Sequence, residues 1–333
     1  MAEPSGSRSP HPSGETKTYA VHGIRVSIRS GWPEFLVLSD LMFGDFGPQG
    51  DTDESLSVDV DLQVRGWFDS PAVRVERRGA EERLGTNEFL EGETARYAGG
   101  KLDVRYTDGR DARVSASYLF DRSSRLRRLL GREQPWDDLY ALFRLAVQEP
   151  VLLKLERRGA LLLHASAVAR DGRAIILVGL NGGGKSTLCA SLLDRMDYVS
   201  DNFVALDAKR VLGFPSALRM PGLPPKGSEG LPTAHGKHFM HPGRSQTIAD
   251  AGALVFLSLG SATALTPLPP DETFRRLLVV QDMTHEFPRH TYLGPLAPPP
   301  DLGRLETVSG QISAYRLVVS RTSEARDRVL SLL

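Results

Sequence analysis

The sequence predicts an α/β protein (α+β overall) in which a domain built on a mixed sheet follows a smaller β-rich domain. Three observations support this fold class. The first third of the chain alternates apolar and polar residues over short stretches, as half-buried strands do. Further along, apolar strands alternate with amphipathic helices. The apolar stretches Ala160–Ala169 and Arg173–Val178 flank Asp171-Gly172, a strong signal for a tight hairpin, so these two strands are expected to pair antiparallel.

The N-terminal part divides into a tail and a β-rich domain. Residues 1–18 are rich in Ser, Pro and Gly and are expected to form a disordered tail. Residues 19–134 are expected to form an accessory domain, in which Ser55–Val64 has the clearest period-two alternation. Gly-rich and Asp-rich turns separate it from shorter predicted strands at Ala20–Ile28, Ala72–Glu76, Leu102–Tyr106 and Arg113–Leu119. No catalytic group of residues stands out in this domain.

Residues 135–333 are expected to form the second domain. Helices are predicted at Ser123–Arg132 and Trp136–Glu156, and Pro150 should kink or interrupt the latter. A doubly wound fold would need a helical crossover where the Asp171-Gly172 hairpin lies, so a mixed sheet is favoured over a purely parallel one. The later predicted elements are strands at Ala253–Leu259 and Gln311–Ser320, and helices at Pro270–Gln281 and from Ser323.

Composition narrows the class of protein. Lysine and arginine number 41, as do aspartate and glutamate, so the formal net charge is zero and a dedicated nucleic-acid binder is disfavoured. The lone cysteine, Cys189, excludes an internal disulfide and suits a reducing compartment. The chain has no apolar run of membrane-spanning length, and its N-terminus lacks the apolar core of a secretory signal. A cytoplasmic protein without a membrane or nucleic-acid partner is expected.

The segment Gly179-Leu-Asn-Gly-Gly-Gly-Lys-Ser-Thr187 matches the phosphate-binding P-loop pattern G-x-x-x-x-G-K-[ST] at each fixed position. Glycines let successive amides face phosphate oxygens, and the following helix adds its positive end. Lys185 is expected to hold the β- and γ-phosphates, and the Ser186 hydroxyl to ligate Mg²⁺. We therefore expect ATP or another nucleoside triphosphate, with Mg²⁺, to bind at Gly179, Asn181, Gly182, Gly183, Gly184, Lys185, Ser186 and Thr187.

Two residues outside the P-loop are candidates for chemistry. Asp201 lies in the middle of the strand-like stretch Met196–Leu206, where a carboxylate can hold Mg²⁺ or accept a proton from an incoming hydroxyl. The ordinary alternative is a turn aspartate between two short strands. His164 lies in an apolar strand beside the P-loop strand, and by itself such a histidine is more often a hydrogen-bonded core residue.

A Pro/Gly-rich stretch, Pro221–Gly243, contains three histidines. His235, His238 and His241 are spaced along it, but no cysteine or acidic partner completes a zinc pattern. The same stretch and its flank carry Lys226, Lys237 and Arg244. A basic loop is therefore favoured over a metal site, and such a loop can meet an acceptor.

Several of these segments together resemble the catalytic domain of the HPr serine kinase/phosphorylase family. They are Leu163-His-Ala-Ser-Ala, the Asp171-Gly172 hairpin, the P-loop and Val199-Ser-Asp-Asn, in this order and spacing. They look closest to the divergent relatives found near peptide-modification gene sets. The resemblance covers roughly Leu161–Leu333 and implies a P-loop kinase fold related to phosphoenolpyruvate carboxykinase, with a mixed sheet.

The resemblance also implies roles for individual residues. Asp201 matches the aspartate that activates the acceptor hydroxyl, and His164 matches a histidine on the phosphate side of the pocket. Ser186 matches the magnesium-binding residue of the P-loop. The family's second aspartate is Asn202 here, which can ligate a metal through its carbonyl but cannot take a proton. The implied catalytic residues are Asp201, His164 and Lys185, and the implied metal ligands are Ser186, Asp201 and Asn202. Members of the family form oligomers, so a homo-oligomer is compatible with the resemblance.

These observations favour an ATP- and Mg²⁺-dependent kinase that transfers the γ-phosphoryl group to a Ser or Thr hydroxyl of a peptide or protein. A kinase of small-molecule hydroxyls is the near alternative, because the same site accepts any positioned alcohol. An NTP-hydrolysing or NTP-sensing regulatory protein is the alternative from another class. A GTPase is disfavoured because the Asn-Lys-x-Asp segment that reads guanine is absent. The acceptor and the preference for ATP over GTP stay open.

Overall fold

The computed structural model describes most of the chain. The described residues are 14–44, 46–48, 50–65, 86–90, 94–99, 101–121, 135–180, 182–214, 216–221, 233–234, 237–240, 242–286, 292–293 and 296–333. Most of the predicted tail, the predicted strand Ala72–Glu76 and the predicted helix Ser123–Arg132 lie outside them, as do Asn181, Lys226, His235 and His241. No helix among the described residues is long and apolar enough to cross a membrane.

The N-terminal part forms a seven-stranded sheet in the order β1-β2-β3-β7-β6-β5-β4. Strand β3 pairs parallel with both β2 and β7, and the remaining pairs are antiparallel. The alternation predicted from Ser55–Val64 is present in β3, whose Leu56, Val58 and Val60 are buried. The strands are β1 (Glu15–Val21), β2 (Ile24–Ser30), β3 (Glu54–Arg65), β4 (Thr86–Leu90), β5 (Thr94–Gly99), β6 (Leu102–Thr107) and β7 (Asp111–Asp121).

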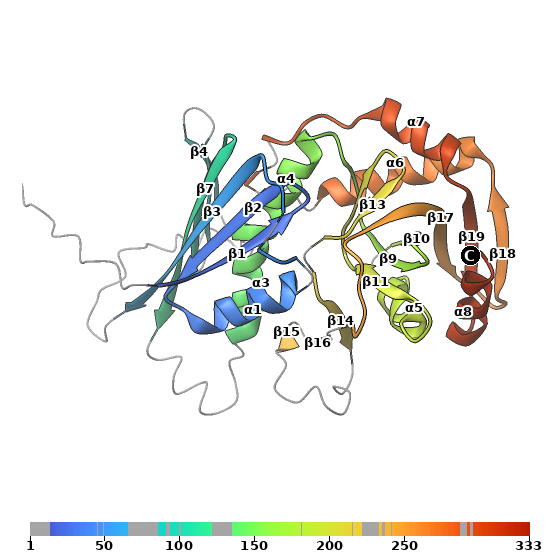
Figure 1. Ribbon diagram of the computed structural model, residues 1–333, viewed down its shortest axis with the longest axis horizontal. Coiled ribbons are helices and arrows are strands. Elements are labelled where there is room, and N and C mark those ends of the chain that lie inside the picture. The colour runs from blue at the N-terminus through green and yellow to red at the C-terminus, as the bar shows by residue number, and fades with distance from the viewer. Residues whose placement is uncertain are drawn as a thin grey trace, which may run out of the picture.

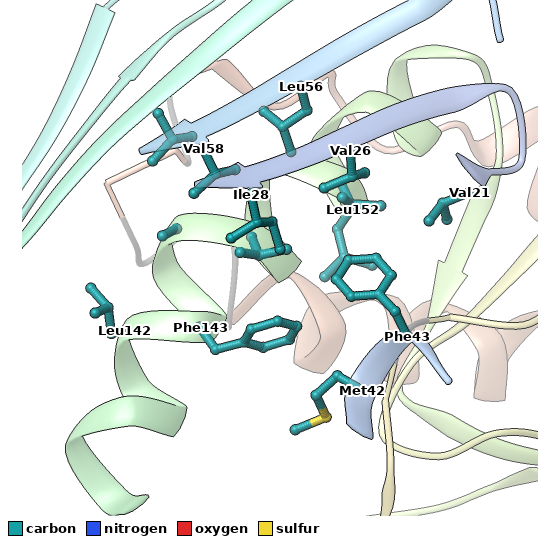
Figure 2. Packing of buried hydrophobic residues seen from close by; sticks show 14 of the residues in the cluster. Val21, Val26, Ile28, Met42, Phe43, Leu56, Val58, Leu142, Phe143 and Leu152 are labelled. Atoms are coloured by element: carbon teal, nitrogen blue, oxygen red, sulfur yellow. The ribbon is translucent and has the colours of Figure 1, made fainter. Parts of the chain in front are cut away.

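Helices cover one face of this sheet (Figure 1). They are α1 (Pro33–Phe43) and a long helix made of α3 (Pro135–Phe143), a π-helical turn η1 (Arg144–Gln148) and α4 (Glu149–Arg157). Figure 2 shows side chains of β2 and β3 meeting those of α1, α3 and α4. The same apolar core includes Phe203 and Phe214 from the second half of the chain. This apolar core crosses the predicted domain boundary between residues 134 and 135. The boundary stays a prediction.

The second half forms a nine-stranded mixed sheet, as expected. Strand β17 pairs parallel with β10 and β19, whereas β10 pairs antiparallel with β9. The branch β8-β12-β13 joins the beginning of β17, and β11 and β18 lie at the edges. The strands are β8 (Leu161–Leu163), β9 (Ala165–Arg170), β10 (Arg173–Val178), β11 (Asp197–Ser200), β12 (Val204–Asp207), β13 (Arg210–Leu212), β17 (Ile248–Leu259), β18 (Ala264–Leu268) and β19 (Ala314–Val319).

Helices pack on both faces of this second sheet (Figure 1). On one face, α6 (Pro270–Glu286) and α7 (Leu302–Gln311) bury Leu277 and Leu305 against Ile176 of β10. On the other, α5 (Lys185–Leu192) and α8 (Thr322–Leu330) bury Leu188 and Val329 against Leu177. The P-loop strand β10 is therefore enclosed on both faces, which fixes the point where the loop begins.

A third, small sheet has the order β14-β16-β15. Its strands are β14 (Leu218–Pro221), β15 (Thr233–Ala234) and β16 (Lys237–Met240). Contacts from the N-terminal part reach the segment that leads into it: His22 Nε2 lies 2.6 Å from the Gly213 carbonyl oxygen, and the Ala217 amide donates to Met42 Sδ at 3.2 Å. Direct hydrogen bonds thus join the N-terminal part to the segment that leads into the small sheet.

Three predicted elements need correction, and the position of a predicted interruption is refined. The segment Ala20–Ile28 is two strands, because His22 and Gly23 take positive φ and form a hairpin turn. Strand β1 begins at Glu15, inside the predicted tail, because Glu15–Thr18 pair with β2. The interruption predicted at Pro150 lies just before the proline, where the π-helical turn separates α3 from α4 and Pro150, which lacks an N–H, lies in the first turn of α4. The strand predicted at Ala160–Ala169 is divided at His164.

Candidate functional site

The P-loop connects the end of β10 to the beginning of α5. Gly182 and Gly184 take φ of 75° and 85°, a left-handed region that glycine enters without strain. The Gly183 amide donates to the Leu180 carbonyl at 3.0 Å and closes a tight turn. No side chain caps α5, so the amides of Lys185, Ser186 and Thr187 have no partner within the helix. These amides and the helix dipole make the turn suited to an anion.

Lys185 is buried and lies across this loop. Its ammonium donates to the carbonyl oxygens of Gly179 at 2.8 Å and Leu180 at 3.1 Å. Burial, with a smaller contribution from the charge of Lys237, lowers the pKa of Lys185 to about 8, against the opposing effect of the Asp201 carboxylate. A polyphosphate would offer this ammonium a stronger, charged partner than the two carbonyls.

Asp201 lies where its carboxylate meets two serine hydroxyls. Ser186 Oγ donates to Oδ1 and Oδ2, both at 3.0 Å, and Ser166 Oγ donates to Oδ1 at 2.5 Å. Ser186 belongs to the P-loop helix, whereas the fully buried Ser166 belongs to β9. The structure therefore brings Ser186 and Asp201 together, and Ser166 joins them.

Hydrogen bonds fix the backbone at Asp201 as well as its side chain. Asp201 follows β11 and precedes β12, so it occupies a turn between two short strands. Ser216 Oγ donates to the Asp201 carbonyl, and Tyr198 Oη donates to the Ser216 carbonyl at 2.6 Å. The turn position was the ordinary alternative for this residue. The contacts show that the turn nevertheless directs the carboxylate to the P-loop serine.

Asn202 has a different surrounding from Asp201. Its φ is 78°, a left-handed conformation in which asparagine is enriched. Burial raises the pKa of the Tyr140 hydroxyl, and a hydrogen bond from the Asn202 side chain opposes this by lowering it. The Asn202 amide is thus joined to helix α3 of the N-terminal core. Its role as a metal ligand stays a prediction.

His164 and His238 are the histidines of interest within the described residues. His164 is buried at the break between β8 and β9, and its ring packs edge-on against Phe203 with 6.1 Å between ring centres. His238 is buried in β16. In the described part of the chain, no group of three His, Cys, Asp or Glu residues could hold a metal. The role of His164 beside the phosphates stays a prediction.

Three hollows in the described part of the surface lie away from the P-loop. One of about 340 Å³ lies over the outer face of the N-terminal sheet, between Arg29 and Ser117. One of about 430 Å³ lies beside Lys154, and one of about 300 Å³ beside Pro298–Pro300. The P-loop lines none of these three. It is an open surface loop, with Leu180 59% exposed, so a ligand can reach its amides directly.

Comparison with known proteins gives limited similarity. The family model described as SynChlorMet cassette protein ScmC matches residues 133–210, which include the P-loop and Asp201. No curated protein matches the chain. Among solved structures, the Hpr(Ser) kinase/phosphatase from Coxiella burnetii matches with 14% identity over 52% of this chain and 98% of that one, at a TM-score of 0.24.

Sequence reasoning missed three residues of the site. Ser166, Ser216 and Tyr140 contact Asp201 or Asn202 from β9, from the segment before β14 and from α3. Ser166 had a local signal, because it is a hydroxyl in an otherwise apolar strand, two residues after His164. Ser216 and Tyr140 had no such signal in the local sequence, since their proximity to the site depends on long-range packing.

Proposed function

We propose that this chain is an ATP- and Mg²⁺-dependent kinase that transfers the γ-phosphoryl group to a Ser or Thr hydroxyl of a peptide or protein. The observation that carries the proposal is the contact between the P-loop Ser186 and the Asp201 carboxylate. It places a carboxylate beside the loop that would hold the phosphates, where a phosphoryl-transfer enzyme needs a base. The resemblance to the HPr kinase family supports the same assignment.

The residues present fit a magnesium–nucleotide complex. Mg²⁺ prefers oxygen ligands, and a serine hydroxyl with one or two carboxylates, completed by phosphate oxygens, is its usual set in such sites. Ser186 would supply the hydroxyl oxygen of such a set and water the positions that a carboxylate would take, so that Asp201 stays available as the base, and the ion would neutralise charge on the phosphates. The amides of the P-loop and the Lys185 ammonium would bind the phosphates and fix their orientation.

The transfer step balances with the groups of this site. The acceptor oxygen attacks the γ-phosphorus, and a new O–P bond forms while the bond from this phosphorus to the β–γ bridging oxygen breaks. The nucleoside diphosphate leaves, and the acceptor proton passes to Asp201. Of the two carboxylate oxygens, Oδ1 accepts from both serines, whereas Oδ2 accepts from Ser186. Oδ2 therefore keeps a lone pair for the incoming proton.

A labelling experiment tests the proposal. The full chain is incubated with γ-labelled ATP, Mg²⁺ and a library of Ser- and Thr-containing peptides, and the products are identified by mass spectrometry. Label on a peptide hydroxyl supports the kinase. Label found only as inorganic phosphate contradicts it and supports an NTP hydrolase instead. Label on an added small alcohol, with none on the peptides, supports the small-molecule kinase.

A further inference from the structure

The small sheet presents a fixed guanidinium near the candidate base. Arg219 of β14 lies over the ring of Tyr140, with its central carbon 4.2 Å from the ring centre. The same ring packs against Phe239 of β16, 5.7 Å between ring centres, so Tyr140 is held on two sides. Tyr140 is in turn joined to Asn202, the neighbour of Asp201. Arg219 is therefore connected, through Tyr140 and Asn202, to the turn that carries the Asp201 carboxylate.

Stacking leaves the hydrogen-bonding edge of Arg219 available. A guanidinium that lies over an aromatic ring uses its face, while its N–H donors point outward in the plane. Within the described residues, Arg219 has no carboxylate at ion-pair distance. It is half-buried. A fixed guanidinium with unused donors is the arrangement that binds carboxylate or phosphate by two parallel bonds.

A second cation lies beside Arg219. In the register of β14 and β16, Arg219 pairs with Phe239 and Pro221 pairs with Lys237. Arg219 and Lys237 therefore lie on the same face of the small sheet. Lys237 is exposed. The segment that leads into this sheet contacts Asp201, because Ser216 Oγ donates to the Asp201 carbonyl. Arg219 and Lys237 thus form a pair of cations on the sheet that follows this contact.

We infer that Arg219, assisted by Lys237, binds an anionic group of the acceptor, so that the preferred acceptor carries a carboxylate or phosphate close to its reacting hydroxyl. This inference rests on the proposed function, because it uses the acceptor side of the same site. It names a substrate class: a Ser or Thr flanked by acidic residues. The two cations also offset the repulsion between such an acceptor and the negative charge of the nucleotide.

Equilibrium binding tests the inference without requiring turnover. Two fluorescein-labelled peptides are compared, one with Asp and one with Asn on both sides of a central Ser, by fluorescence anisotropy with the full chain. We expect the acidic peptide to bind about tenfold tighter, the effect of one charged hydrogen-bonded contact. Arg219→Ala should remove this preference, and Arg219→Lys should keep part of it as a point charge. Lys237→Ala should reduce it by less.

The controls separate this inference from the proposed function. Arg195→Ala removes an exposed arginine at the far end of α5 and should leave both affinities unchanged. Binding of a non-hydrolysable ATP analogue should be the same for wild type and Arg219→Ala. Equal affinity for both peptides, absence of binding by either, or a preference that survives in Arg219→Ala would overturn the inference. Loss of analogue binding in Arg219→Ala would assign Arg219 to the nucleotide and overturn it too. Thermal melts confirm that each variant folds.

Discussion

The Ser186 hydroxyl lies 3.0 Å from each carboxylate oxygen of Asp201, and this contact joins the two parts of the candidate site. Ser186 belongs to the first turn of the helix after the P-loop, and Asp201 follows a different strand. Their side chains meet because β9 pairs with both β10 and β11, which sets the turn at Asp201 close to the loop. Sheet order therefore creates the site.

Asp201→Asn should separate binding from chemistry. The amide keeps the shape of the side chain but cannot accept the acceptor proton. We expect phosphoryl transfer to fall by about 10²-fold or more, while affinity for the nucleotide changes little. Initial rates of transfer and calorimetric binding measure the two effects. Asp207→Asn, at the exposed end of β12, is the matched control. Unchanged transfer in Asp201→Asn would remove Asp201 from the role of base.

Nucleotide affinity should fall as the pH rises above about 8, the pKa to which burial lowers Lys185. Below this pH Lys185 carries its charge and attracts phosphate. Above it the free protein loses the charge, so binding must take up a proton, and affinity drops by up to about tenfold per pH unit. Calorimetric titrations with a non-hydrolysable ATP analogue from about pH 7 to pH 10 measure the slope.

Lys185→Arg is the control for this pH dependence. Its guanidinium stays charged across the whole range, so whatever affinity remains should no longer change with pH. A slope that persists in Lys185→Arg would show that another group titrates. A flat profile in the wild type would contradict the lowered pKa of Lys185.

The partly buried ion pair between Lys154 and Glu54 should contribute to the attachment of the N-terminal sheet to α4, beside the pairs that Arg157 and Arg158 make with the same sheet. Lys154 Nζ donates to Glu54 at 2.8 Å and to the carbonyls of Gly109 and Arg110, and its side chain is 3% exposed. Lys154→Met leaves Glu54 with Arg158 as its remaining partner and should lower the free energy of unfolding by about 1–3 kcal/mol. Urea unfolding measures the loss.

Two further variants identify the cause of that loss. In Lys154→Met with Glu54→Leu, both charges of this pair are gone while Arg158 keeps Asp53 as a partner, and part of the lost stability should return. Arg29→Ala breaks the exposed pair with Asp59 and should cost less than about 1 kcal/mol. If Arg29→Ala and Lys154→Met lower the free energy of unfolding equally, burial of the Lys154 pair does not increase its contribution to stability.

His22 should make the fold sensitive to mild acid. Burial lowers the pKa of His22 below its ordinary value of 6.5, although its bond to the Gly213 carbonyl partly opposes this. The folded state therefore binds the proton less readily than the unfolded chain. Stability is full above pH 6.5 and is lost as the pH falls through this value toward the folded pKa. Melting temperatures measured across this window should drop.

His22→Asn isolates the contribution of the histidine. Asparagine tolerates the positive φ of 46° at this position and does not titrate. The melting temperature of this variant should depend less on pH between about 5 and 7 than that of the wild type. The same acid dependence in both proteins would exclude His22 as its source.

Local patterns predicted the parts of the fold that depend on neighbouring residues. Asp171 and Gly172 both take positive φ, as the Asp-Gly hairpin requires, and β9 pairs with β10 in the expected register. The mixed sheet followed from this turn. Helix α7 and strand β18 were not predicted, because the Pro- and Gly-rich segments around them hide their periodicity.

The candidate site was predicted only where its residues belong to a motif. The P-loop provided Lys185 and Ser186, and the family resemblance provided Asp201. Ser166 escaped notice because its hydroxyl meets Asp201 across 35 residues of sequence. Tyr140 and Arg219 escaped because a helix of the N-terminal core and a strand of the small sheet come together only in the folded chain. Contacts of this kind depend on tertiary packing, which sequence periodicity does not contain.

Binding of a magnesium–ATP analogue to the wild type and to Lys185→Ala tests the central claim most directly. The claim is that the amides of Gly179–Thr187 and the Lys185 ammonium hold a polyphosphate. Isothermal titration calorimetry should show one site per wild-type chain and an affinity lower by about tenfold or more in Lys185→Ala, as expected for a lost charged bond. Equal affinity in the two proteins, or no binding by a correctly folded wild type, would contradict the claim.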